Sequence, residues 1–183
     1  IVPLLISSVT ATSLAYFFSG SEAMFKFNTY QPFAIERIPY LILLGIVCGL
    51  VSLYFTRGMN RLEKFFRKLR KPYLKIAVGG ITLSILIFIF PPLYGEGYET
   101  IVSLLNGHSA SALDRSFFLG FGNSPWVLVT YLVLIIIFKI FAATATTSSG
   151  GVGGIFAPSL FIGCLTGFVV ARVFNTFGIA MPE

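Results

Sequence analysis

The sequence predicts an all-α integral membrane protein, because it is rich in apolar residues, poor in charge and built from long uncharged runs. Hydrophobic residues make up 56% of the 183 residues and charged residues 11%, and the mean hydropathy is +0.88. Soluble domains carry about 25% charged residues. A disordered chain needs low hydrophobicity and high charge, so this class is excluded and a soluble enzyme is disfavoured.

Five apolar segments are the expected membrane helices, since a bilayer core takes about 20 apolar residues of helix. We place them, within a single transmembrane domain over residues 1–183, at 1–18, 38–56, 74–94, 126–147 and 155–173. Pro39 lies in the first turn of the second segment, Pro125 directly precedes the fourth, and Pro158 lies near the start of the fifth. A first helical turn tolerates proline, because its N–H groups have no intrahelical partner.

The connectors differ in charge, and this difference predicts how the chain is oriented. The connector 57–75 holds one acid, Glu63, and the basic residues Arg57, Arg61, Lys64, Arg67, Lys68, Arg70, Lys71 and Lys75. The positive-inside rule therefore places it in the cytoplasm. Because the loops are short, we expect the membrane to be a bacterial inner or plasma membrane. Either it only sets the orientation, or it also docks anionic lipid head groups. Because its charge lies between apolar segments, the net charge of +6 does not indicate nucleic acid.

The remaining reactive side chains form no recognisable metal centre or catalytic group. Cys48 and Cys164 both lie in apolar segments and are expected to pack there, forming neither a disulfide nor a zinc site. His108 stands alone in the connector 95–125 and is expected to be solvated. We find no nucleophile–base pair and no carboxylate pair in the membrane. We therefore expect neither an enzyme nor a bound cofactor.

The most informative stretch is a glycine-rich break between the fourth and fifth segments. Its glycines are Gly150, Gly151, Gly153 and Gly154, and a new apolar helix begins near Ile155. The first N–H groups of a helix lack partners and lie at the positive end of its dipole. Glycines let a ligand approach them, which makes an anion site without a full charge. The alternative is that the glycines only allow close helix packing.

Lys139 is a single charge deep in the fourth segment. A lysine at this depth costs about 3 kcal/mol in lipid, so we expect it to face protein or water. One interpretation is a lysine that snorkels inward or pairs with a carboxylate. The other is electrostatic support for a nearby anion.

The stretch Ser148–Pro158 resembles a signature of the CLC family of chloride channels and chloride/proton antiporters. That family has a glycine-rich loop followed by Gly-Ile-Phe-Ala-Pro, and this sequence matches it from Gly153 to Pro158 without departure. The order of apolar segments, the basic connector and the long third connector support the same resemblance. It implies part of a CLC-type inverted-repeat helical bundle, with a broken helix at the glycine loop.

The resemblance also implies a function and a site. Chloride would be the transported ion, with protons as a second ion in an antiporter, and the full-length chain would be a homodimer in membrane lipid. The anion would be held by the backbone N–H groups of Ile155 and Phe156, with Ala157 as a third. The segment 1–18 would end the first half of the membrane domain and lie at the subunit interface, and the other four would open the second half.

The family's Gly-Ser-Gly-Ile-Pro and Gly-Lys/Arg-Glu-Gly-Pro motifs do not occur in this sequence. Ile1 already lies in an apolar run, so we expect a chain truncated at both ends that does not conduct alone. Two other functions stay open. One is a secondary transporter of another fold for an anionic substrate, and the other is a structural or assembly module.

Overall fold

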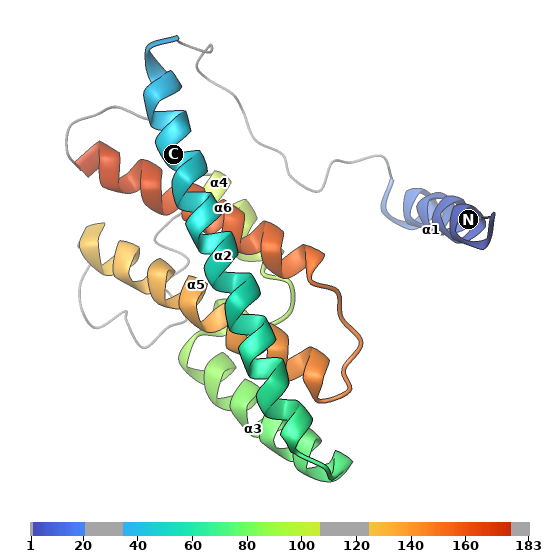
Figure 1. The fold of residues 1–183 in the computed structure, drawn as a ribbon. Helices are drawn as coiled ribbons and strands as arrows, with labels where there is room; N and C mark the ends of the chain where they lie inside the picture. The colour runs from blue at the N-terminus through green and yellow to red at the C-terminus, as the bar shows by residue number, and fades with distance from the viewer. Residues whose placement is uncertain (1, 21–34, 107–124, 177–183) are drawn as a thin grey trace.

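The computed structural model in Figure 1 describes residues 2–20, 35–106 and 125–176, and within these ranges every regular element is a helix. The elements are α1 (Val2–Ser19), η1 (Ile35–Arg37), α2 (Ile38–Lys68), α3 (Pro72–Ile89), η2 (Pro91–Leu93), α4 (Tyr98–Leu105), α5 (Pro125–Ser148) and α6 (Phe156–Thr176). The expected solvated side chain, His108, lies outside the described residues.

Four described helices, α2, α3, α5 and α6, are long and apolar enough to cross a membrane. The all-α membrane fold predicted from the sequence is therefore confirmed. The stretch Val2–Phe18 of α1 is also apolar but shorter, so a membrane span over residues 1–18 stays a prediction.

Two helix ends differ from the expected segments for local reasons. The helix α2 continues past residue 56 through Lys68, so most of the basic connector is helical. Glu63 and Arg67 form an ion pair one turn apart, which supports that extension. The third segment ends as a helix at Ile89, and η2 follows at Pro91. Its two prolines cannot continue a helix.

The helix α5 is the centre of the bundle. It contacts α2, α3, α6 and η2, and in Figure 1 the long helix α2 crosses both α5 and α6. Tyr131, Leu132 and Ile135 of α5 are fully buried, as are Phe161 and Leu165 of α6. Lipid tails are as apolar as these side chains, so close packing rather than exclusion from water holds such helices together in a membrane.

Wide apolar faces lie outside this core. The described side chains of α1 are all exposed, and α1 lies apart from the other helices in Figure 1. The glycine pairs Gly45/Gly49 and Gly163/Gly167 have the spacing of a close-packing motif. A Cβ atom added to any of them would meet no described atom within 4 Å. Their helix faces are therefore open in the described part of the chain.

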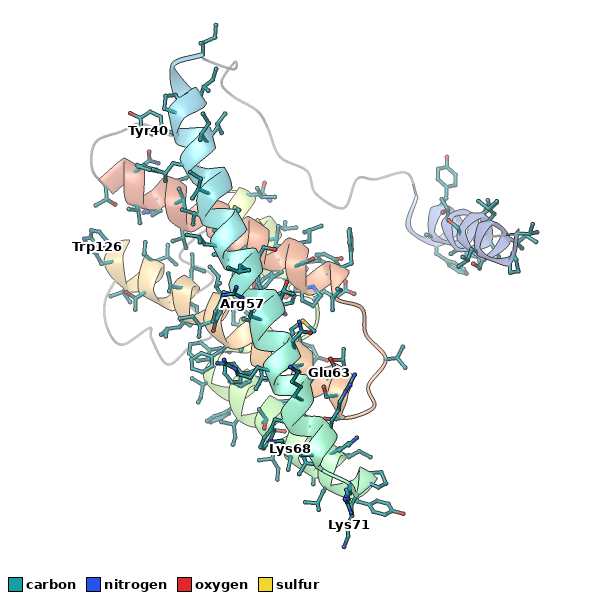
Figure 2. All side chains as sticks on the ribbon, viewed as in Figure 1. Tyr40, Arg57, Glu63, Lys68, Lys71 and Trp126 are labelled. Carbon is teal, nitrogen blue, oxygen red and sulfur yellow. The ribbon has the colours of Figure 1, made fainter. Side chains whose placement is uncertain are left out.

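The two ends of the bundle differ in character. In Figure 2, Tyr40 and Trp126 lie toward one end, while Lys68 and Lys71 lie toward the other. Aromatic side chains gather at membrane interfaces, and basic side chains gather on the cytoplasmic side. The distribution suits a bundle that crosses a bilayer along its length.

Candidate functional site

The backbone conformation at the end of α5 requires glycine at the first two glycine positions of the loop, Gly150 and Gly151. Gly150 has a φ of 100°, in the left-handed region. Gly151 N–H donates to Thr146 O at 2.9 Å, five residues back, as in a Schellman cap. A Cβ atom on Gly151 would lie 2.7 Å from that oxygen. These two glycines therefore stop α5 and turn the chain.

A matched pair of variants tests this division of the loop. Gly150→Ala should lower the free energy of unfolding by about 1–2 kcal/mol, because alanine is strained at positive φ. Gly153→Ala should change it by less than about 0.5 kcal/mol, since a Cβ atom there meets no described atom within 4 Å. Thermal unfolding of the full-length protein in detergent measures both. Equal destabilisation by the two variants would contradict the assignment.

The second pair of glycines has no such structural requirement within the described residues. Neither Gly153 nor Gly154 has a positive φ. A Cβ atom on Gly154 would have the backbone nitrogen of Phe156 as its near neighbour, at 3.9 Å. A side chain at residue 154 would therefore stand in front of the start of α6. The absence of side chains here keeps that helix end open.

The start of α6 presents unpaired backbone donors. Ser159 N–H donates to Ile155 O at 3.1 Å, which is the first bond of the helix. The N–H groups of Phe156 and Ala157 thus have no intrahelical acceptor, and Pro158 has no N–H to offer. The first turn of α6 carries no acidic residue. The first turn itself therefore supplies no negative side chain to offset the positive end of the helix dipole.

A cleft of about 540 Å³ lies in front of this helix end. It is lined by the predicted site residues Gly153, Gly154, Ile155, Phe156, Ala157, Pro158 and Lys139, and also by the turn Leu93–Glu96. Gly150 and Gly151 do not line it, in keeping with their part in ending α5. The structure therefore brings one predicted lysine and one predicted helix start to the same cleft.

Lys139 faces protein, as expected for a charge at this depth. Its side chain is 2% exposed. Its ammonium donates to Gly95 O at 3.0 Å and to Leu93 O at 3.4 Å, and lies 4.6 Å from the centre of the Phe161 ring. Its close partners are thus backbone carbonyls and an aromatic face, which together stabilise a buried cation. Neither is a carboxylate.

The turn between η2 and α4 is the part of the site that sequence reasoning missed. Gly95 and Gly97 have φ values of 59° and 82°, and a Cβ atom on Gly97 would collide with Phe161 of α6. The sequence Pro91-Pro92 followed by these glycines is a turn signal. The turn brings Glu96 to the cleft. Desolvation and Glu96 raise the pKa of the neighbouring Tyr98 phenol, so this hydroxyl stays protonated.

Comparisons with known proteins agree on one family. The family model described as voltage gated chloride channel matches residues 1–182. A ClcB-like protein of Ralstonia nicotianae is 29% identical over 91% of this chain. The voltage-gated ClC-type chloride channel ClcB of Escherichia coli (strain SMS-3-5) is 26% identical over 99% of it, and the chloride channel protein CLC-e of Arabidopsis thaliana is 30% identical over 98%. This chain spans 35%, 39% and 24% of their lengths. No solved structure matches the chain.

Proposed function

The chain belongs to the voltage-gated chloride channel (CLC) family, and from this premise we propose that it forms part of a chloride-transporting membrane protein. The observation that carries the proposal is the open start of α6. Its unpaired N–H groups, cleared by Gly153 and Gly154, lie on a cleft that also holds Lys139. The N–H groups of Ile155, Phe156 and Ala157 hold the anion in this proposal.

The chemistry suits transport better than tight binding. A helix start carries the equivalent of about half a positive charge, so a chloride ion that has lost part of its water shell is stabilised without a direct salt bridge. A transported ion must bind well enough to enter and weakly enough to leave. The ammonium of Lys139 is already held by two carbonyl groups. Lys139 therefore does not bind the ion directly but raises the positive potential at the cleft.

The arrangement of the whole protein is proposed from the family. Full-length chains would pair as a homodimer, with α1 at the subunit interface, where its exposed apolar side chains would find a partner. The basic stretch 57–75 would lie in the cytoplasm, in keeping with the positive-inside rule. The protein would then be either a channel or a chloride/proton antiporter.

Chloride efflux from proteoliposomes that hold the full-length protein, with external pH measured in parallel, tests the function. Efflux that drives protons against their gradient identifies an antiporter, and efflux without coupled proton movement identifies a channel. An absence of chloride efflux from folded, dimeric protein would contradict the proposal.

Access to the helix start can be tested directly with a cysteine probe. We expect Ile155→Cys, made after replacing Cys48 and Cys164, to react with a water-soluble thiol reagent, because Ile155 is 59% exposed on the cleft. Chloride should slow the reaction by severalfold if the ion occupies the site. Cysteine at Ile162, which is 4% exposed in the same helix, is the control and should stay unreactive. If the cysteine at 155 were as unreactive as the cysteine at 162, the result would favour a structural module without an ion path.

A further inference from the structure

A second, smaller hollow lies where α2 ends and α3 begins, next to the last turn of α5. Its volume is about 230 Å³, and it is lined by Glu63, Phe66 and Arg67 of α2, Lys75 of α3, and Thr147 and Ser148 of α5. We propose that this hollow binds the phosphate head group of an anionic phospholipid. The proposal concerns a lipid site and does not depend on the chloride site.

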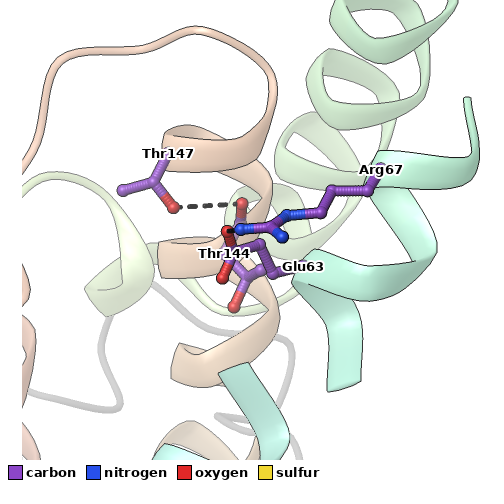
Figure 3. Close-up of polar contacts among 4 residues, drawn as sticks. All are labelled: Glu63, Arg67, Thr144 and Thr147. Carbon is purple, nitrogen blue, oxygen red and sulfur yellow. Dashed lines mark hydrogen bonds and ion pairs between the residues drawn. The ribbon is translucent and has the colours of Figure 1, made fainter. Parts of the chain in front are cut away.

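The first argument is charge. Glu63 is the single acid among residues 57–75, and its Oε1 accepts a hydrogen bond from Arg67 Nη2 at 2.8 Å. Figure 3 shows the Arg67 side chain reaching from α2 toward the last turn of α5, near Thr147. A guanidinium has five N–H donors in a fork that suits phosphate oxygens. One ion pair therefore leaves donors available, and the charge of Lys75 is not offset by another acid in this stretch.

The second argument is the start of α3. Lys71 is its N-cap and makes no side-chain capping hydrogen bond, Pro72 opens the helix, and its first turn contains no acid. The lysines at 71 and 75 thus lie at the positive end of the α3 dipole, where a cation is unfavourable. Helices usually begin with an acidic or hydroxyl side chain. An external anion would supply the missing negative charge and relieve this repulsion.

The third argument identifies a lipid rather than a soluble phosphate. Tyr73 is 82% exposed and Phe65 is 55% exposed, and both lie in the sequence among the basic residues. Tyrosine and tryptophan side chains next to membrane helices sit at the level of the lipid head groups, which fits Tyr73. Leu74 and Ile76 of α3, on either side of Lys75 in the sequence, are also exposed. In this proposal the head group lies in the hollow and the acyl chains cover these apolar side chains.

The test compares two charge-matched double variants of the full-length protein in detergent, with added phosphatidylglycerol counted by native mass spectrometry. Arg67→Gln with Lys75→Gln removes two cations from the hollow, and glutamine at 67 keeps an amide donor for Glu63. Arg61→Gln with Lys64→Gln removes two cations from exposed positions of α2 that do not line it. Each basic residue near a head group contributes about fivefold to binding. We expect the first pair to weaken phosphatidylglycerol binding by about thirtyfold, and the second by less than fivefold.

Three results would overturn the proposal. Equal weakening by both pairs would mean a diffuse basic surface. Equal binding of phosphatidylcholine to the unmodified protein would mean that the negative head group is not recognised. Displacement of phosphatidylglycerol by millimolar inorganic phosphate would mean a soluble-anion site. If the first pair does not give a monodisperse protein, Lys75→Gln alone decides, with an expected fivefold loss. This experiment does not measure chloride efflux. Its failure would therefore overturn the lipid site without affecting the proposed chloride transport.

Discussion

Replacing Gly154 with leucine in the full-length protein is expected to weaken chloride binding by at least tenfold. Apart from the glycine itself and its two chain neighbours, the nearest described atom to a Cβ at this position is the nitrogen of Phe156, at 3.9 Å. A side chain there would stand beside a donor of the proposed site and keep the ion from it, while its Cβ atom would make only an ordinary van der Waals contact. A hydrogen bond to a charged partner is worth about 1.5–3 kcal/mol, and 1.4 kcal/mol is tenfold in affinity. Titration calorimetry with chloride measures the effect.

The control for this variant is leucine at Gly80. A Cβ atom at Gly80 of α3 would meet no described atom of the rest of the chain within 4 Å, and this residue does not line the cleft. It should leave chloride affinity unchanged, while Gly154→Ala should give an intermediate loss. Unaltered chloride binding by a folded Gly154→Leu protein would count against the backbone site. The glycines would then serve contacts with parts of the protein outside the described residues.

Replacing Lys139 with methionine is expected to lower both chloride affinity and stability. The ammonium is held by Leu93 O and Gly95 O, so its loss leaves two carbonyl groups without this donor, which costs about 1–3 kcal/mol if they stay dry. Removing a buried charge offsets part of that cost. At an effective dielectric constant of about 20, a unit positive charge across a cleft contributes about 1–2 kcal/mol to the free energy of binding a chloride ion. We therefore expect chloride affinity to fall by about tenfold.

Two further substitutions separate the charge of Lys139 from its hydrogen bonds. Lys139→Gln keeps an amide donor but removes the charge, so it should lower chloride affinity with a smaller loss of thermal stability than methionine. Lys139→Arg keeps both the charge and the donors and should stay closest to the unmodified protein in chloride affinity. Unchanged chloride affinity and transport rate in the methionine variant would show that Lys139 only holds the turn. Calorimetry and thermal unfolding of the same preparations give both values.

The fold could be predicted from the sequence because its signals are local. Long apolar runs specify membrane helices without reference to the rest of the chain, and the Gly153–Pro158 motif was enough to identify the family, which the family model confirms. The apolar run predicts only the part of α2 that lies in the membrane core, to residue 56, and so it does not give the end of the helix at Lys68. A helix can leave the apolar layer and continue when its polar residues pair one turn apart, as Glu63 and Arg67 do.

The surroundings of the candidate site could not be predicted in the same way. Lys139 meets the carbonyl group of Gly95, which lies 44 residues earlier in the chain. Periodicity shows which face of a helix is apolar, but it does not show which distant turn folds onto that face. The contact between Phe161 and the backbone at Gly97 is equally long-range. The anion-binding N–H groups themselves stay a prediction from sequence, to which the structure adds a cleft and a lysine.

The bonds of Lys139 also bear on how the protein is made. A lysine in the middle of a helix opposes insertion into the bilayer by about 3 kcal/mol, a cost that the apolar residues of α5 have to offset when the helix inserts by itself. The turn that holds its ammonium follows α3 and is synthesised before α5. An earlier part of the chain thus holds the acceptors that a later helix needs. Insertion of α5 should therefore be helped by α3 and its following turn already in place, and α5 transplanted alone into a reporter protein should enter the membrane less efficiently than the same helix with Lys139→Leu.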